Sequence, residues 1–452
     1  MRTFFRSRGK SSPSRGFTLL ELLVGAAVST VVLAGISLTF ISQARQYQVH
    51  ASRRGVQANA RQALAFLGRH LRTVGYGVDP DRAILSWDSY DAASNQQAPG
   101  FPDAFAVHFR DELFRRRAQS VAPNQITLQT SEPLRPGQEL RRGQILLVLC
   151  ARDPSFPDPS VDENPPHVFV TVGAYVGPGS TDIPLDQNPV AASDDRPTQR
   201  PGRLFHEQDT PGFAHPCFSR QPPHVLRVQR AAFYVAMFTH PTTGERKPYL
   251  MMHQGLDMPS PNNPEGDGVI DAHDAVPVAE GIEQLQVAYV LDTHNQDIDQ
   301  TPLILGVNGS MGTEHFGENW EQIDLAHLPH GWFFNVGFGA VDPLVMADRR
   351  LRDHPANIRQ VRLTLVSRSA LPDPQFTGDD LLRRPDGTPY PDGAALPNGT
   401  IPWRHLENLE LPPAADFTPS GGGFYRMLLR ESITPKNLLL NRQFAPITPG
   451  GG

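Results

Sequence analysis

One carboxylate, Glu21, lies inside a long apolar segment that directly follows a basic leader. From Phe17 to Ile41 it is the only ionisable residue, and a charge inside a membrane helix costs on the order of 2.5 to 3.5 kcal/mol unless a cation neutralises it. If the chain is cut between Gly16 and Phe17, the new α-amino group lies one helical turn from Glu21. These residue types therefore suit a peptide cleavage followed by a carboxylate–amine pair, within one subunit or between neighbours.

The segment ahead of this site is a short cationic leader. Residues 1–16 are rich in Ser, Gly and Pro, which argues against folded structure there. Their ionisable residues are all basic: Arg2, Arg6, Arg8, Lys10 and Arg15. Residues 17–41 are long enough to cross a membrane as a helix and too long for the apolar core of an ordinary secretory signal. The charge distribution places the N-terminus in the cytoplasm and predicts that the bulk of the chain is exported.

The run Gly16-Phe17-Thr18-Leu19-Leu20-Glu21 resembles the class III signal of type IV pilins and type II secretion pseudopilins. The resemblance implies that a membrane aspartyl peptidase, the prepilin peptidase, cuts after Gly16 and N-methylates Phe17. It also implies that Glu21, the fifth residue of the mature chain, guides the docking of each subunit against its neighbour. The alternative is a plain signal anchor with a lone interfacial glutamate.

The residue pattern divides the chain into a leader, a helix and a head. After the membrane segment, apolar residues such as Leu64, Leu67 and Leu71 recur three or four positions apart, which predicts a helix over residues 17–74. Glycines after Val74 and Pro80 supply its stop. We expect an exported, β-rich head over residues 75–452, and thus an α+β chain.

Composition limits the class of the head without identifying it. The 452 residues are 39% hydrophobic, with 44 prolines and 38 glycines, which favours many loops between strands. A net charge of −6 disfavours a nucleic-acid groove over the whole surface, so we expect no nucleic acid as partner. The usual hydrolase, zinc-protease, nucleotide and dinucleotide motifs do not occur, and the sequence supports no enzymatic activity.

Seven segments read as strands. They are 104–109, 125–130, 144–150, 167–176, 225–238, 282–291 and 361–367. In the sixth, Leu285, Val287 and Tyr289 share one face and Gln284 and Gln286 the other, which predicts a half-buried antiparallel strand. The proline-rich and acidic stretches at 153–163, 186–202 and 371–400 read as surface insertions.

Parts of the second half resemble minor pilins of PilW type. Residues 279–289 and 358–369 look like their paired strands, and 424–430 with 434–438 look like their closing segment, although Lys436 stands where arginine is more usual. The resemblance implies a pilin-like fold, in which the long N-terminal helix packs on an antiparallel sheet. The head is bulky for such a protein and 292–355 matches nothing in the family. That bulk suits a filament tip.

The chain has two cysteines, Cys150 and Cys217. Because the head is expected outside the cytoplasm, where disulfides persist, we predict one bridge. It would close a loop of roughly 66 residues and contribute about 4 kcal/mol in the chain-entropy model. The alternative is two separate buried thiols. We do not expect zinc at His215 and Cys217, since a zinc site would need further ligands at matching spacing.

One loop has the spacing of an EF-hand-type calcium site, with Gly268 at the sharp turn. Its candidate ligands are Asn263, Glu265, Asp267, the Val269 carbonyl, Asp271 and Asp274. The loop departs from the motif because Asn opens it, Glu holds its third position and Asp closes it. A solvated Asp/Gly turn that binds nothing is the alternative. Calcium is the one cofactor that the sequence indicates.

The leading hypothesis is therefore a type IV pilus minor pilin. It would span the inner membrane once, with a periplasmic head, and then join a cell-surface pilus. The family implies as partners the prepilin peptidase, the major pilin, other minor pilins and a PilY-type tip adhesin. A type II secretion pseudopilin is the second hypothesis. A third is an adhesin or DNA-uptake protein displayed on a pilin stem.

Overall fold

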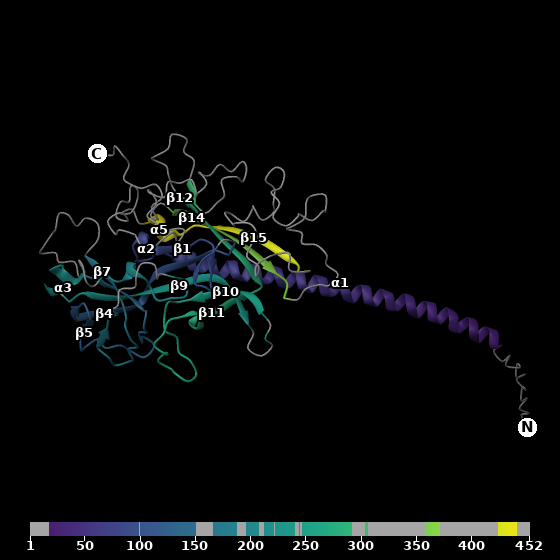
Figure 1. The fold of residues 1–452 in the computed structure, drawn as a ribbon, viewed down its shortest axis with the longest axis horizontal. Coiled ribbons are helices and arrows are strands. Elements are labelled where there is room, and N and C mark those ends of the chain that lie inside the picture. Colours follow the sequence, from purple (N-terminus) through teal and green to yellow (C-terminus); the bar gives the residue numbers. More distant parts are fainter. Residues whose placement is uncertain are drawn as a thin grey trace, which may run out of the picture. The chain divides into compact units, whose positions relative to one another are not determined.

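The computed structural model describes residues 18–98, 100–150, 166–187, 196–207, 212–220, 222–239, 244, 246–291, 303–305, 358–370 and 424–440 (Figure 1). The leader, the insertions at 153–163 and 371–400, residues 188–195 of the stretch 186–202, and most of 292–355 lie outside these residues. Contacts divide the chain into two compact units, Met1–Arg54 and Gly55–Gly452. The second half of the N-terminal helix therefore belongs to the same unit as the strands.

The element order follows a long helix with a β-rich head. The helical elements are α1 (Leu19–Thr73), α2 (Pro80–Ala83), η2 (Arg203–Phe205), η3 (Gly212–Ala214), α3 (Cys217–Arg220), η4 (Ala272–Asp274) and α5 (Lys436–Leu440). The first strands are β1 (Ile84–Trp87), β2 (Tyr90–Asp91), β3 (Gln96–Gln97), β4 (Ala104–Ala122), β5 (Gln125–Leu128), β6 (Ile145–Leu149), β7 (His167–Thr171) and β8 (Asp182–Pro184). The later strands are β9 (His224–Thr239), β10 (Arg246–His253), β11 (Val276–Glu280), β12 (Ile282–Leu291), β13 (Leu303–Leu305), β14 (Ile358–Arg368) and β15 (Arg426–Ile433).

Helix α1 ends at Thr73, where the sequence predicted its stop. Gly75 and Gly77 follow in the left-handed region, with φ of 75° and 62°, a backbone conformation that glycine adopts without strain. A Cβ on Gly75 would lie 2.5 Å from the Leu438 side chain. The helix stop thus also makes room for α5.

The larger sheet is antiparallel, in the order β11-β10-β9-β4-β5-β8. Strand β1 also pairs with β4, β6 pairs with β9, and β7 pairs with β6. The long strands β4 and β9 form its centre, with Phe105 opposite Phe233. All seven predicted strand segments lie on strands of this sheet or of the smaller one.

The smaller sheet has the order β13-β12-β14-β15, and Gly281 forms its junction with the larger one. Gly281 donates its N–H to the Pro248 carbonyl at 2.8 Å and accepts from the Arg368 N–H at 2.7 Å. Its φ is 77°, and a Cβ there would lie 2.6 Å from the Arg368 oxygen. A side chain at this position would therefore disrupt the turn from β11 into β12.

The prediction of a half-buried strand at 282–291 is wrong. Leu285 and Tyr289 are buried as expected, but Gln284 and Gln286 on the opposite face are also buried, each with 0% of its surface exposed. Alternating polarity shows that the two faces of a strand differ, but it does not show whether another segment covers the polar face. Strand β12 is enclosed on both faces.

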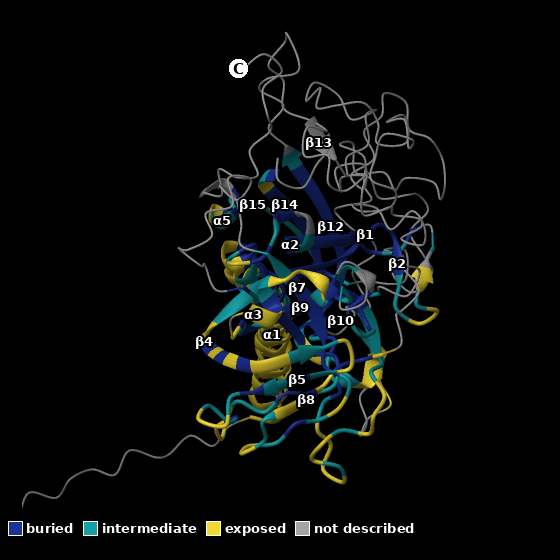
Figure 2. Cartoon of the chain, turned by 90° about the vertical axis from the view of Figure 1, so that its left-hand side faces the viewer, coloured by how far each residue is buried: buried dark blue, intermediate teal, exposed yellow. Residues whose placement is uncertain are grey.

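The second half of α1 packs against both sheets (Figure 1). The Phe66 ring meets Phe233 of β9 edge-on, with centroids 6.0 Å apart. On the other side, a Cβ on Gly68 would lie 3.4 Å from Ile433 of β15. Figure 2 shows the buried strands β9, β12 and β14 in dark blue. A second apolar cluster, which includes Phe114 and Val170, lies between β4, β5, β6, β7 and β8.

Candidate functional site

Glu21 lies in the first turn of α1, where Thr18 holds its carboxylate. The Thr18 N–H and hydroxyl donate to Glu21 Oε2 at 3.0 and 3.1 Å, and the Glu21 N–H donates to Thr18 Oγ1 at 3.2 Å. This reciprocal arrangement is a capping box. Thr-x-x-Glu is the spacing of a capping box, but the resemblance to a class III signal assigns no role to Thr18. Gly16 and Phe17 lie outside the described residues.

The segment that follows Glu21 presents its apolar side chains outward. Leu22, Val31 and Phe40 are 68%, 72% and 68% exposed. By length and composition, α1 is able to cross a membrane. Exposed leucine, valine and phenylalanine over this length would be unfavourable in water, at about 25 cal/mol per Å² of apolar surface, so this surface requires lipid or other helices around it.

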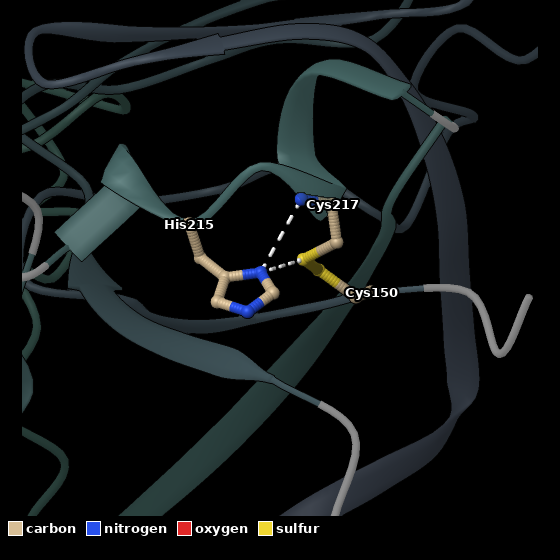
Figure 3. A group of neighbouring side chains, drawn as sticks. All are labelled: Cys150, His215 and Cys217. Carbon is tan, nitrogen blue, oxygen red and sulfur yellow. Dashed lines mark hydrogen bonds between the residues drawn. A yellow bond between two sulfur atoms is a disulfide. The ribbon is translucent and has the colours of Figure 1, made fainter. Parts of the chain in front are cut away.

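The structure pairs Cys150 with Cys217 in a disulfide, with Cα atoms 6.0 Å apart. Cys150 follows β6, and Cys217 begins α3. His215 lies beside the bridge, with Nδ1 2.9 Å from the Cys217 sulfur (Figure 3). The Cys217 N–H donates to the same ring nitrogen at 3.2 Å. The predicted bridge is confirmed, and it fixes α3 against the end of the sheet.

The six predicted calcium ligands lie in one loop, but the structure uses its carboxylates for hydrogen bonds to the backbone. Asp267 Oδ1 accepts from the Val269 N–H at 2.8 Å. Asp271 and Asp274 form a capping box around η4, in which Asp274 Oδ2 accepts from the Asp271 N–H at 3.0 Å. Asn263 forms a backbone bridge with Ser260, and Arg141 donates to the Glu265 carbonyl at 3.5 Å.

Two residues that the sequence analysis missed organise this loop. Asp257, which is buried, accepts from the N–H groups of Asp267 and Gly268 at 3.0 and 2.8 Å. His253 accepts at Nδ1 from the Gly255 N–H at 2.9 Å, so its Nε2 carries the proton and donates to the Asp271 carbonyl at 2.8 Å. Burial lowers the pKa of His253 to about 4, which keeps the ring neutral.

Among the described residues, no three carboxylates of this loop bring oxygen atoms within 4.8 Å of one another. Partial burial, together with the nearby carboxylates of Asp257 and Asp271, raises the pKa of Asp274. The loop is thus a hydrogen-bonded acidic turn in this structure. Calcium binding stays a prediction of the sequence.

A second acidic feature joins the two sheets. Asp88 and Asp103 are 5% and 4% exposed, and their side chains hydrogen-bond to each other. Asp103 also accepts from the N–H groups of Ser89 and Val287, at 3.2 and 2.8 Å. Burial, followed by the charge of Asp88, raises the pKa of Asp103 well above its usual range. We therefore expect Asp103 to keep a proton well above the pH at which an ordinary aspartate loses it.

The raised pKa of Asp103 predicts that the head loses stability as pH rises. A carboxyl group whose pKa is higher in the folded state contributes stability that is fully present below its unfolded pKa of about 3.9 and is lost as pH rises toward the folded value. We expect Asp88→Asn to weaken this loss, because the amide can donate to Asp103 without adding a second charge. Melting temperatures of the detergent-solubilised full chain between pH 4 and 8 measure this loss of stability.

The variant should melt a few degrees above the wild type at pH 7, since about 1 kcal/mol moves the midpoint of a domain of this size by about 2–4 °C. Glu112→Gln is the matched control, because Glu112 is exposed and should leave the profile unchanged. Identical pH profiles for Asp88→Asn and wild type would show that Asp88 does not raise the pKa of Asp103.

Comparison with known proteins finds a family motif near the N-terminus of the chain. Residues 11–37 match the model of the prokaryotic N-terminal methylation motif. The match contains Gly16, Phe17 and Glu21, and it supports a class III signal of type IV pilin-like proteins. The motif implies processing by a prepilin peptidase and assembly with other pilins. No curated protein and no solved structure matches the chain.

The motif and the fold agree with each other. A long apolar N-terminal helix packed with antiparallel sheet is an α+β layout consistent with a pilin. Together they fit a membrane-anchored protein of pilin or pseudopilin type that later joins a filament. The motif suggests a structural subunit rather than an enzyme.

Proposed function

We propose that this chain is a minor pilin of PilW type that takes part in initiating a type IV pilus and occupies the filament tip. The prepilin peptidase cuts between Gly16 and Phe17 and methylates Phe17. Before assembly, the mature subunit is anchored in the inner membrane with its head in the periplasm. The observation that carries the proposal is the methylation motif at residues 11–37, at the start of an exposed apolar helix.

Assembly in this proposal is noncovalent. The carboxylate of Glu21 is exposed at the first turn of α1, and so it remains open to the α-amine of an adjacent subunit. In a low-dielectric environment an unpaired carboxylate is costly, and the attraction to an amine offsets the free-energy cost of its desolvation. The exposed apolar face of residues 19–41 supplies the packing surface, and the head selects partners.

A type II secretion pseudopilin is the second candidate, because the methylation motif fits it equally. The PilW-like segments of the head favour the pilus, since 282–291 and 358–368 form the central strand pair of the smaller sheet, with Leu285 opposite Leu365. Deletion of the gene separates the two candidates. Loss of surface pili and motility supports the minor pilin, whereas loss of enzyme secretion supports the pseudopilin.

The first test is the identity of the mature N-terminus. We expect the protein from membranes to begin at methylated Phe17, as measured by intact mass and N-terminal peptide analysis. A strain without the prepilin peptidase is the control, and there the chain should begin at Met1. A chain that begins at Met1 with the peptidase present would make this a signal-anchored protein, and would exclude assembly as proposed.

A further inference from the structure

The part of α1 beyond the apolar segment is cationic and contains no acidic residue. After Glu21 the next carboxylate in the sequence is Asp79. Between Ser42 and Thr73 the ionisable side chains are Arg45, His50, Arg53, Arg54, Arg61, Arg69, His70 and Arg72, together with Tyr47. Helices of this length normally mix both signs of charge on their exposed faces, since opposite charges one turn apart stabilise the helix.

The rest of the chain has the opposite charge. Of the 41 basic and 47 acidic residues, 11 and 1 lie in residues 1–73, which leaves 30 basic and 46 acidic residues and a net charge of −16 beyond Thr73. The chain thus carries a cationic helix and an acidic remainder. Such a distribution favours head-to-stem contacts between subunits.

The six arginines of α1 are all exposed. Arg61 and Arg72 are spaced by eleven residues, about three helical turns, and so lie on one side of the helix, with Arg69 beside them. The buried residues lie on another side of the helix: Val56, Ala60, Ala63, Leu64, Leu67, Gly68 and Leu71. We call Arg61, Arg69 and Arg72 the arginine face.

The chain itself neutralises little of this charge. Arg72 pairs with Glu431 at 3.8 Å, and both side chains are well exposed, so the pair is worth about 0–1 kcal/mol. Within the described ranges, no carboxylate lies within 4.0 Å of the guanidinium of Arg61 or Arg69. A surface of opposite charge would therefore gain their interaction without breaking an existing ion pair.

Position in the chain argues against lipid head groups as that surface. Arg61, Arg69 and Arg72 follow Ile41, the last residue of the apolar segment, by at least 20 residues, and they belong to the compact unit that contains the strands. The head-group layer on each side of a bilayer is only about 5–8 Å thick, and charges interact over about 8 Å at physiological ionic strength. Arg45 follows Ile41 by only four residues and is the arginine best placed to meet lipid.

We infer that the arginine face docks onto an acidic surface of a neighbouring pilin-like subunit. The inference rests on the proposed function and adds the chemistry of the partner. The residues beyond Thr73 carry a net charge of −16, so a second copy of this chain has the acidic groups that such a contact needs. Docking along the stem steers subunits together before the shorter-range pair at Glu21 forms.

Charge reversal tests this inference. In cells, Arg61→Glu with Arg69→Glu in the full chain should reduce at least tenfold the recovery of other subunits with the N-terminal methylation motif. The reduction should be smaller at high salt, where the wild-type contact also weakens. Arg61→Lys with Arg69→Lys keeps the charge and should assemble. Arg117→Glu with Arg135→Glu makes the same charge change at two exposed arginines of the head and should assemble like the wild type.

A photo-crosslinking residue at Ala65, which is exposed beside the arginine face, identifies what lies there. We expect crosslinks to an acidic segment of another motif-bearing subunit, and their loss in the charge-reversed chain. A crosslinker at Ser120 of the head is the control. Crosslinking at Ala65 to anionic phospholipid instead would overturn the inference in favour of a membrane surface.

Two further comparisons separate this inference from the proposed function. Cleavage after Gly16 and an unchanged melting temperature show that the reversed chain is inserted and folded. If the reversed chain assembles normally while Glu21→Ala does not, the arginine face is not a docking surface and the pilin proposal stands. If neither variant affects assembly, the proposed function itself fails.

Discussion

Replacing Glu283 by alanine is expected to destabilise the head by about 3–5 kcal/mol, because the change leaves buried arginines without their carboxylate. The Glu283 and Arg426 side chains are both 0% exposed. Arg426 donates through Nε to Oε2 at 2.6 Å and through Nη2 to Oε1 at 3.1 Å. Arg368 adds a contact to Oε1 at 3.3 Å, and the Phe424 ring lies 4.5 Å from its guanidinium.

The cost arises because the two guanidiniums stay buried when the carboxylate is removed. Desolvation of an ion is expensive, and this group of charges links β12, β14 and β15. Thermal or urea unfolding of the detergent-solubilised full chain measures the effect. Glu431→Ala is the matched control, since Glu431 also pairs with an arginine but is exposed, and its loss should cost less than 1 kcal/mol. Equal effects of the two substitutions would contradict the prediction.

Replacing Glu21 by alanine is expected to abolish incorporation into the pilin complex while cleavage after Gly16 continues. The substitution removes the carboxylate that the proposed function pairs with a neighbour's amine, and it leaves the leader and the apolar segment intact. Co-purification of motif-bearing subunits from crosslinked membranes measures incorporation, and N-terminal analysis of the same samples measures processing.

Glu21→Ala also removes the capping box with Thr18, and a control must separate the two effects. Thr18→Ala removes the cap but keeps the carboxylate, and losing a cap costs only about 0.5–2 kcal/mol of helix stability. We expect this variant to assemble. Unchanged incorporation of Glu21→Ala would exclude its role in docking, and an equal defect in both variants would assign the effect to the helix end.

The acidic loop at 263–274 shows why spacing alone does not decide whether a carboxylate binds calcium. The sequence pattern considered only residues inside the loop, whereas Asp257 and His253 lie ahead of it and hold it through Gly268 and the Asp271 carbonyl. A carboxylate that accepts backbone N–H groups and one that coordinates a cation look the same in a sequence. Only the direction of their oxygen atoms distinguishes them.

The elements that depend on local sequence were predictable. The apolar run, the capping residues and the glycines after Val74 fix α1 from Leu19 to Thr73, because helix formation and termination act over one or two turns. The strands followed from the same kind of local pattern. The pairing of Cys150 with Cys217 was a reasonable expectation, since the chain offers only two cysteines.

By itself the sequence determined the class III signal, the membrane-length helix, the charge of its stem and the β-rich nature of the head, because each depends on residues close together in the chain. Tertiary structure alone decided that β12 is buried on both faces, that Asp88 and Asp103 form a buried pair, and that Glu283 meets two arginines. Arg368 and Arg426 lie 85 and 143 positions from Glu283. Contacts over such separations form only when the sheets assemble. The low dielectric constant of the buried site then strengthens the interactions between these charges.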